Sequence, residues 1–339
     1  MVGIKEVAQK AGVSVATVSR VFSNGPHVRA EVRAHVLKVA DTLGYRPNRI
    51  ASSLRKQSSS VIGLLVSDIR NPFFVEVARA IEDVAHSHNV RLFLCNTDEN
   101  PEKEQAYLET LLDEMVSGII LSPTRETADV FEFLLNSGTP VVAIDRRITG
   151  AVIDCVLSNN SQSAYALTAH LIKNGYTNLG ALMGPSMTGR DRFLGFKTAL
   201  DENNLDLNPK FAMHIQPRES ESEAIVSRWL ASGQYPHAII TGNSRITLGA
   251  IDAIHKAGLS VPGDIALAGF DDTVWMPYIG AGITVISQPT YEIGTTAAEL
   301  LFQRMADPLR STREVVLNGK LIERGSSALT PEITRKEIP

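Results

Sequence analysis

Five short apolar runs of the chain are followed by polar or charged residues that could bind a hydroxylated small molecule. Carboxylates and amides accept hydrogen bonds from neighbouring hydroxyls, and arginine supplies rigid donors. Two phenylalanines at the start of a predicted helix add an apolar face for a ring. Each side chain alone is equally well explained as a helix cap or a salt-bridge partner, but their joint placement favours a ligand site. The candidates are Ser67, Asp68, Phe73, Phe74, Ser122, Asp145, Arg146, Arg192, Asn243 and Asp271.

A second set of residues, in VSVATVSRVFSN at 13–24, suits contact with DNA. If the valines at 18 and 21 of this predicted helix face a core, then an arginine, hydroxyls and small side chains face outward. Arginine pairs with guanine O6 and N7, small apolar side chains admit a thymine methyl, and hydroxyls bond phosphates. The residues concerned are Ser14, Val15, Ala16, Thr17, Ser19 and Arg20. A three-helix bundle with an idle exposed face is the alternative.

Charge is divided unevenly along the chain and supports contact with DNA. Residues 1–60 hold ten Lys and Arg against three Asp and Glu, which is +7, whereas the remainder holds 23 against 34, which is −11. A basic head suits a polyanion, because neutralising phosphates releases counterions and drives nucleic-acid binding. A solvated basic surface would carry the same charge, so the helix motif has to decide.

The elements that must position the outward-facing helix are predicted within the first 46 residues. Apolar residues at helical spacing predict a helix over 4–11, which Gly12 ends in a left-handed conformation. Ser14 is placed to cap the second helix, and a third amphipathic helix is predicted from about 29 to 43. Three short helices with a tight turn between the first two indicate a helix-turn-helix. The second helix is expected to end at Asn24, Gly25 and Pro26.

The segment over 47–60 reads as more than a flexible linker. Pro47 breaks the third helix, and the serines at 58–60 suit a flexible join. Between them, residues 48–55 have room for about two helical turns, which are too short to be stable alone in water. An external partner would have to stabilise such a helix, and a disordered tether is the alternative.

The strand ends that carry the ligand candidates belong to a regular alternation that begins at Val61. Apolar runs such as VIGLLV, RLFLCN, GIIL and VVAI alternate with amphipathic helical segments, and a second series contains LGALMG, FAMHI, AIIT and IALAGF. This alternation predicts two doubly wound lobes with parallel sheets. A ligand would lie in the cleft at the carboxyl ends of the strands, where Arg192 is expected to open a helix.

Composition excludes several classes of protein. With 44% hydrophobic and 21% charged residues and no apolar run near the ~20 residues of a membrane span, we expect no membrane contact. The start of the chain lacks a secretory pattern, which predicts the cytoplasm. Cys95 and Cys155 lie in apolar runs and are predicted to be buried free thiols. No GxSxG, Walker A, GxGxxG or metal-ligand spacing occurs, so no catalytic centre, cofactor or metal is predicted.

The motifs IKEVAQKAGVSVATVSRVF, GYRPNRIASSLR and SSVIGLLVSDIRNPFF resemble those of the lactose-repressor and purine-repressor (LacI/GalR) family of bacterial transcription regulators. The likeness runs from Ile4 to about Pro331. It implies an all-α helix-turn-helix head at 1–46, a hinge helix and linker at 47–60, and an α/β periplasmic-binding-protein-like body at 61–339. The two doubly wound parallel-sheet lobes of that body would hold about 61–159 with 289–318, and about 160–288 with 319–331, so that the chain crosses between them three times.

The resemblance also implies roles for single residues. The family's hinge helix folds on DNA, pairs with its dimer mate and inserts a leucine into the minor groove, where an apolar wedge can kink a base step. Leu54 matches that leucine; the DNA contacts implied in the hinge are Asn48, Arg49, Leu54 and Arg55. The positions that match the family's effector contacts are Phe73, Asp145, Arg146, Arg192, Asn243 and Asp271.

The sequence therefore predicts a DNA-binding regulator, in the form of a repressor, that reads a pseudo-palindromic operator as a homodimer under the control of a small effector. A sugar or sugar derivative is the first expectation; the arginines leave an anionic ligand open, and a purine is the runner-up because two phenylalanines also suit a base. An enzyme with an accessory DNA-binding domain and a periplasmic binding protein are the alternatives of other classes. Two prolines and no leucine heptads after Arg324 favour a dimer over a tetramer. The sign of the effector's action stays open.

Overall fold

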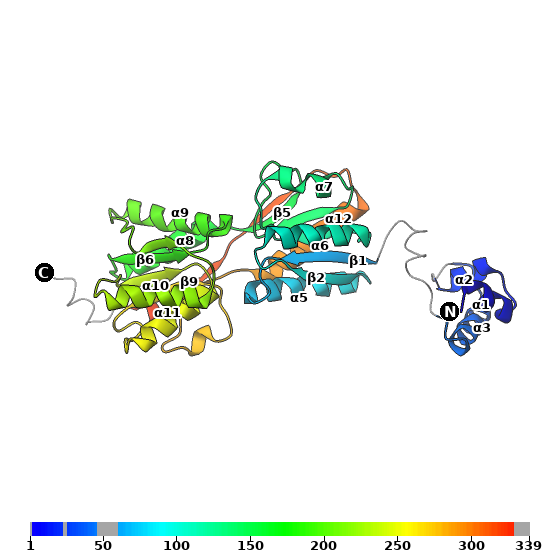
Figure 1. Cartoon of the computed structure of the whole chain (residues 1–339), viewed down its shortest axis with the longest axis horizontal. Helices are drawn as coiled ribbons and strands as arrows, with labels where there is room; N and C mark the ends of the chain where they lie inside the picture. Colours follow the sequence, from blue (N-terminus) through cyan, green and yellow to red (C-terminus); the bar gives the residue numbers. More distant parts are fainter. Residues whose placement is uncertain (1, 23–25, 46–59, 329–339) are drawn as a thin grey trace. The chain divides into compact units, whose positions relative to one another are not determined.

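The structure is a computed structural model that describes residues 2–22, 26–45 and 60–328. The chain divides into two compact units, residues 1–59 and 60–339, which we call the head and the body and describe one at a time (Figure 1). The head is helical and the body has two mainly parallel sheets, so the predicted fold class is confirmed. Several residues with predicted roles lie outside the described residues: Asn24, Gly25, Asn48, Arg49, Leu54 and Arg55.

The described part of the head consists of three helices around one small core. The apolar spacing of the sequence explains why Val7, Val18 and Val36 are fully buried between these helices. Gly12 has a φ of 65° and ends the first helix in the left-handed region, as predicted. The Ser14 hydroxyl accepts a hydrogen bond of 3.1 Å from the backbone N–H of Thr17, so Ser14 caps the second helix as predicted. The helices are α1 (Ile4–Ala11), α2 (Val15–Phe22) and α3 (Ala30–Thr42).

The first lobe of the body, the N-lobe, is a parallel sheet covered by helices on both faces, with strand order β11-β5-β4-β3-β1-β2. Leu64 packs with α5 and α12 on one face, whereas Leu65 packs with α6 and α7 on the other. Burial on both faces is why these strands read as continuous apolar runs. The elements are β1 (Val61–Val66), α5 (Pro72–Ser87), β2 (Arg91–Asn96), α6 (Pro101–Asp113), β3 (Ile119–Leu121), the 3-10 turn η1 (Ala128–Phe131), α7 (Glu132–Leu135), β4 (Val141–Ile144), β5 (Asp154–Ser158), α12 (Thr290–Ala306) and β11 (Glu314–Leu317).

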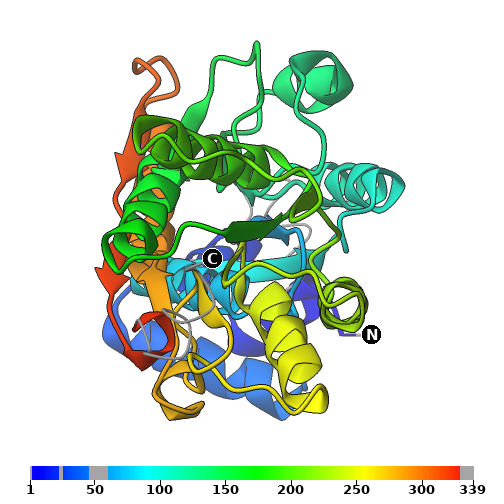
Figure 2. The same cartoon turned by 90° about the vertical axis from the view of Figure 1, so that its left-hand side faces the viewer.

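The second lobe, the C-lobe, repeats this layout with strand order β12-β10-β9-β8-β6-β7, and β12 runs antiparallel to β10. Figure 2 looks at the body from the end of this lobe, where α8 and α9 cover one face of the sheet and α10 and α11 the other. The elements are α8 (Asn160–Lys173), β6 (Leu179–Met183), α9 (Met187–Glu202), β7 (Ala212–His214), α10 (Glu219–Ala231), β8 (Ala238–Thr241), α11 (Ser244–Lys256), β9 (Ala266–Phe270), η2 (Met276–Tyr278), β10 (Thr284–Ser287), β12 (Lys320–Ile322) and η3 (Gly325–Ser327).

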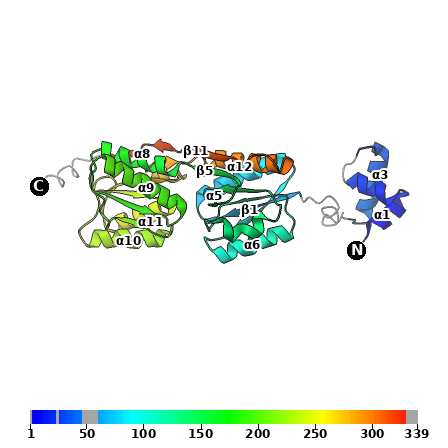
Figure 3. The same ribbon diagram turned by 90° about the horizontal axis from the view of Figure 1, so that it is seen from above.

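The chain passes between the two sheets after β5, after β10 and after β11 (Figure 3). Helix α8 follows β5 of the N-lobe but packs on α9 of the C-lobe, and α12 follows β10 of the C-lobe but packs on α5 of the N-lobe. Glycines let both helix pairs approach closely. A Cβ at Gly195 would lie 2.0 Å from the carbonyl oxygen of Ser161, and one at Gly294 would lie 2.6 Å from that of Val77.

Three local expectations differ from the structure. Helix α9 begins at Met187, so Arg192 lies in its second turn and does not open it. The amphipathic helical segment expected between the runs GIIL and VVAI is a 3-10 turn followed by four helical residues. Cys155 is buried, but Cys95 is only half-buried, because β2 is the edge strand of its sheet and has one neighbour. In the described parts of the chain, every helix is too short or too polar to cross a membrane.

Candidate functional site

A cavity of about 280 Å³ lies between the two lobes, at the carboxyl ends of their strands. Its lining comes from both lobes, as expected for the cleft of paired doubly wound sheets. Ser67 does not line it, but eight of the ten ligand candidates do: Asp68, Phe73, Phe74, Asp145, Arg146, Arg192, Asn243 and Asp271. Ser122 does not line the cavity. Its side chain is fully buried and lies behind that of Asp145.

Two aspartates occupy equivalent positions in the two lobes. Asp145 follows β4 and Asp271 follows β9, and both have a positive φ, 66° and 73°. Each backbone N–H donates at 3.0 Å to the neighbouring strand, to Val156 O in β5 and to Ile286 O in β10. Aspartate tolerates this left-handed conformation better than most residues, and the turn directs each carboxylate into the cleft. Burial raises the pKa of both carboxyl groups; the charges of Arg146 and Arg192 oppose that shift at Asp145, and the charge of Arg192 opposes it at Asp271.

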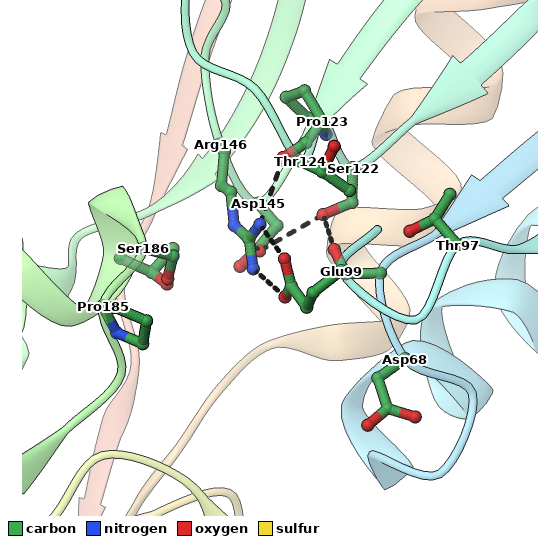
Figure 4. A network of polar contacts seen from close by, with 12 residues as sticks. Asp68, Thr97, Glu99, Ser122, Pro123, Thr124, Asp145, Arg146, Pro185 and Ser186 are labelled. Carbon is green, nitrogen blue, oxygen red and sulfur yellow. Dashed lines mark hydrogen bonds and ion pairs between the residues drawn. The ribbon is translucent and has the colours of Figure 1, made fainter. Parts of the chain in front are cut away.

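The N-lobe wall of the cavity is a closed network (Figure 4). Arg146 donates from Nη1 and Nη2 to the carboxylate of Glu99 at 2.7 and 2.5 Å, and from Nη1 to the carbonyl of Pro123 at 3.1 Å. Burial disfavours the charged guanidinium, but the hydrogen bonds to Glu99 and the charges of Glu99, Asp145 and Glu126 together outweigh it and raise the pKa of Arg146. Ser122 contacts Asp145 at 3.4 Å. This wall is therefore held together without a ligand.

The C-lobe wall is built around Arg192, which neutral groups hold. Its Nε donates to the side-chain oxygen of Asn160 at 2.8 Å, its Nη1 donates to the carbonyl of Gly242, and its guanidinium lies 4.0 Å from the centroid of the Phe270 ring. Burial lowers the pKa of Arg192, and the charge of Asp271 opposes this. Stacking on an aromatic face fixes the guanidinium plane toward the cleft.

Buried polar atoms without partners adjoin this cavity. Within the described residues, Gln288 Oε1 and Ser244 Oγ are buried and form no hydrogen bond, and Arg146 Nε forms only an ion pair, at 3.3 Å from Asp145 Oδ2. Gln288 Nε2 donates a hydrogen bond of 2.6 Å to Asp271 Oδ1, whereas the side-chain oxygen of Gln288 has no hydrogen-bond partner in the described part of the chain. Such groups are rare in folded proteins and cost free energy, so a cluster of them beside a cavity indicates a ligand that supplies the missing partners.

Two ion pairs join the lobes at the rim of the cavity. Arg245 of α11 bonds Asp68 of the N-lobe at 2.6 Å, and Arg190 of α9 bonds Glu126 of the N-lobe at 2.5 Å. Arg245 is itself fixed by a bidentate bond to Glu219 at 2.6 and 2.7 Å. The carboxylate of Asp68, a ligand candidate, thus forms an ion pair between the two lobes.

The sequence did not point to several residues of the site. Glu99 lies three residues beyond the predicted strand RLFLCN, so the rule that selected strand ends would have found it with a wider window. Gln288 follows β10, a strand that was not predicted, so its position had no signal. Asn243 has two uses: it lines the cavity, and its side-chain oxygen accepts from Ile246 N–H at 2.9 Å to cap α11.

The exposed face of α2 carries the residues predicted to meet DNA. Val15 is 40% exposed, Ala16 and Arg20 are exposed, and Ser19 and Thr17 are half-buried. The Ser14 hydroxyl lies 2.9 Å from that of Thr17, so both are ordered at the start of the helix. Arg33 of α3 donates to Val21 O at 2.9 Å and fixes the far end of α2. The helix therefore presents small side chains at its N-terminal end and an arginine further along.

No group of three or more His, Cys, Asp or Glu that could hold a metal ion occurs among the described residues.

Known proteins match the chain over nearly its whole length. The family described as "Bacterial regulatory proteins, lacI family" matches residues 3–48, and a "Periplasmic binding protein-like domain" matches residues 168–327.

Two relatives and one solved structure illustrate the likeness. A ribose operon repressor of Halalkalibacterium halodurans is 34% identical over 329 residues, which cover 96% of each chain. The HTH-type transcriptional repressor PurR of Photobacterium profundum is 32% identical over 329 residues, covering 96% of this chain and 98% of that protein. The lac repressor dimer bound to operator and the anti-inducer ONPF has a TM-score of 0.85 at 25% identity, covering 97% of this chain and 99% of that one. The chain thus belongs to the lacI family of bacterial regulatory proteins.

Proposed function

We propose that this protein is a sequence-specific transcriptional repressor whose affinity for operator DNA is set by a small effector held between the lobes of the body. The observation that carries the proposal is the cavity, to which both lobes contribute a buried carboxylate from equivalent strand ends, Asp145 and Asp271. A ligand that bonds both carboxylates favours the arrangement in which the lobes are close. The head supplies DNA binding, in line with its family match over residues 3–48.

In this proposal α2 enters the major groove of the operator. Arg20 bonds guanine O6 and N7, Val15 and Ala16 lie against bases where larger side chains would not fit, and hydroxyls bond phosphates. The phosphate ligands are Ser14, Thr17 and Ser19. The hinge adds a minor-groove contact in which Leu54 is the wedge, supported by Asn48, Arg49 and Arg55.

The effector in this proposal is a sugar or sugar derivative. Paired carboxylates suit vicinal hydroxyls, and Phe73 and Phe74 supply the apolar face that a sugar ring needs. These two rings are perpendicular, with centroids 5.0 Å apart and an interplanar angle of 87°. A purine is the second candidate, because the aromatic face that Phe73 and Phe74 offer to the cavity also suits a base. Ser122 acts through Asp145 and does not touch the ligand.

We propose further that the protein works as a homodimer in the cytoplasm, without cofactor or turnover. The edge strand β2 supports an interface, because Phe93 and Leu94 are 45% and 46% exposed on it, and exposed apolar edges are otherwise aggregation sites. Sedimentation of the free protein tests this. A monomer contradicts it, and a tetramer that survives removal of residues after Pro331 contradicts the choice of a dimer.

The effector couples to DNA through its preference for one arrangement of the lobes. A ligand shifts operator affinity only by its differential affinity for the two states, about 1 to 3 kcal/mol in typical cases. Closure of the cleft changes how the hinges of a dimer are held, and so whether two Leu54 side chains insert together. A cleft ligand that leaves operator affinity unchanged would contradict this coupling.

The test of DNA reading uses operator duplexes selected from a random pool and a scrambled duplex of equal length. Arg20→Ala is expected to lose about 1 to 3 kcal/mol on the operator, because one base pair in each half-site loses its bidentate partner, and to keep weak nonspecific binding. Fluorescence anisotropy at fixed salt measures both affinities.

The control variant is Lys38→Ala, which removes an exposed cation from α3 of the same head. It is expected to change operator and scrambled affinities by the same small factor. If Arg20→Ala also weakens both duplexes equally, Arg20 contacts phosphate alone and the assignment of base readout is wrong.

A further inference from the structure

Two of the three arginines that line the cavity are already paired with carboxylates of this chain. Arg146 holds Glu99 through two bonds of 2.7 and 2.5 Å. Arg245 holds Asp68 at 2.6 Å and Glu219 at 2.6 and 2.7 Å. Charge-assisted pairs of this geometry are strong. An incoming anion would have to displace one of these carboxylates before it could use either arginine.

The third arginine cannot serve an anion alone, because two buried carboxylates face it. Arg192 is bonded by neutral oxygens of Asn160 and Gly242, and its charge acts on both Asp271 and Asp145. Each of these two aspartates is at least nine-tenths buried. The residues that line the cavity therefore carry five carboxylates against three guanidinium groups before any ligand enters.

Several groups at the cavity keep spare capacity to accept hydrogen bonds. Gln288 Oε1 is buried and unpartnered within the described residues. Asp145 accepts from Ser122 at 3.4 Å and lies 3.3 Å from Arg146 Nε, whereas Asp271 accepts from Gln288 Nε2 at 2.6 Å and from the N–H of Ser244 at 3.4 Å, so each carboxylate keeps lone pairs for further donors. A ligand that brings donors would satisfy these groups, whereas a ligand that brings acceptors would not.

The size of the cavity limits the ligand as well. At about 280 Å³ it lies at the lower end of the range for small-molecule sites, roughly 300–1,000 Å³. This space suits a single sugar ring. Phe73 and Phe74 close one side of it with apolar surface that gains nothing from a charged substituent.

We propose that the effector is an uncharged polyol of monosaccharide size, and that the cavity excludes phosphorylated and carboxylated forms of the same sugar. Its hydroxyls donate to Asp145, Asp271 and the side-chain oxygen of Gln288, and accept from Arg192. A phosphate or carboxylate brings acceptors and a negative charge to a cavity whose lining has five carboxylates and three arginines, so repulsion and unmade hydrogen bonds act in the same direction. This inference rests on the proposed effector function and narrows it.

Calorimetric titration of the full-length protein with matched ligand pairs tests the inference. The pairs are ribose with ribose 5-phosphate, glucose with glucose 6-phosphate, and glucose with gluconate, and hypoxanthine stands for a base. We expect a neutral sugar to bind and its charged counterpart to bind about 100-fold more weakly or worse. A charged member that binds within about 10-fold of its neutral partner, or more tightly, overturns the inference.

Two isosteric variants test the electrostatic cause. Asp145→Asn and Asp271→Asn each remove one negative charge at constant size, so the charged sugar is expected to lose less affinity than the neutral one, or to gain some. The ratio between the two affinities should narrow by about 10-fold. Asp201→Asn, at an exposed site on α9, should leave the ratio unchanged. An unchanged ratio in both cleft variants, with thermal unfolding showing that they are folded, overturns the electrostatic explanation.

The proposed function fails in a different way. If a neutral sugar binds with the expected selectivity but operator affinity does not change, the effector role is wrong and the charge selectivity stands. If hypoxanthine alone binds, or a phosphorylated sugar binds and changes operator affinity, the regulator stands and the inference is wrong. If no probe binds, the inference and the sugar effector are both wrong.

Discussion

The two lobes of the body share a sheet order but present different walls to the cleft. In the N-lobe, the arginine beside the carboxylate of Asp145 is locked by Glu99 at 2.5 and 2.7 Å. In the C-lobe, Arg192 lies near Asp271 without such a lock, and Gln288 Oε1 has no partner within the described residues. One wall is complete before a ligand arrives, and the other is completed by the ligand. Binding free energy should therefore come mainly from the C-lobe.

The largest expected effect is the loss of effector binding on truncation of the C-lobe carboxylate. Asp271→Ala removes the charge that stabilises the buried Arg192 guanidinium and leaves Gln288 Nε2 without its acceptor, so effector affinity should fall by about 3 to 5 kcal/mol. Asp145→Ala leaves Arg146 paired with Glu99 and should cost less, about 2 to 3 kcal/mol. Calorimetric titration measures both. Asp201→Ala on the surface of α9 is the control, and an equal loss in the two cleft variants would remove the contrast between the walls.

The next prediction concerns the stability of the fold. It compares the α8–α9 helix pair, which contains Gly195, with the α5–α12 helix pair, which contains Gly294. A Cβ at Gly195 would meet the Ser161 carbonyl at 2.0 Å, whereas one at Gly294 would meet the Val77 carbonyl at 2.6 Å. Both Gly→Ala changes should push a helix pair apart and destabilise by about 1 to 3 kcal/mol, with Gly195→Ala the worse. Differential scanning calorimetry gives the order. Lys197→Ala, on the exposed side of α9, should change little, and a neutral Gly195→Ala would mean that the α8–α9 contact yields easily.

A smaller expected effect is a gain in stability on mutation, whereas the preceding variants lose affinity or stability. Burial raises the pKa of Asp271, so the folded ligand-free protein holds this proton more tightly than the unfolded chain does. The stability contributed by Asp271 is therefore lost as the pH rises from the ordinary carboxyl pKa through the raised one, and the cost persists at pH 7. Asp271→Asn should raise the Tm of the ligand-free protein at pH 7 by about 2 °C, since ~1 kcal/mol moves Tm by roughly that amount.

The measurement is Tm against pH for both proteins without ligand. The gain should shrink as the pH falls toward about 3, below the ordinary aspartate pKa of ~3.9, where the wild-type carboxyl is protonated in both states. A variant that is less stable at pH 7 would show that the bonds from Gln288 and Ser244 outweigh the cost of burying the charge.

The smallest effect on effector affinity is expected for the partly exposed ion pair between Arg190 and Glu126. Arg190 and Glu126 pair across the lobes, but their side chains are 49% and 33% exposed. A pair in such solvent contributes about 0 to 1 kcal/mol, so Arg190→Ala should change effector affinity by less than about 5-fold and lose even that effect at high salt. Titration at two salt concentrations checks this. A larger, salt-independent loss would place Arg190 in direct contact with the ligand.

The sequence predicted those parts of the fold that lie in apolar runs alternating with helices. Strands β1 to β4 and β6 to β9 were found because their runs have this pattern. The strands at which the chain passes between lobes, β5, β10, β11 and β12, were missed. Their runs, DCVLS, TVIS, EVVL and KLI, each mix polar with apolar residues, and their pairing joins segments far apart, such as Cys155 with Glu314. Local patterns carry no information on such partners.

The site was predictable to the extent that it depends on strand ends. Asp145, Asn243 and Asp271 follow apolar strands at once or after one glycine, so position alone selected them. The hydrogen bonds and ion pairs that the side chains of the site form were not predictable. Which arginine is paired depends on Glu99, on a different loop, and the engagement of Asp68 depends on Arg245 from the other lobe. Such pairings are set by tertiary distance and not by spacing along the chain.

The passage of the chain between lobes also governs how the protein is made. Strands β1 to β5 leave the ribosome first, but the face formed by Ile120, Val142 and Ile144 is covered by α12, which begins at Thr290. At 5–20 residues per second, the intervening stretch of about 130 residues takes on the order of 10 s to synthesise. During that time the apolar face of β3 and β4 in the N-lobe sheet lacks α12, the helix that later covers it. The nascent chain should therefore depend on chaperones over a defined window of translation, which closes for both lobes almost together once α12, β11 and β12 have emerged.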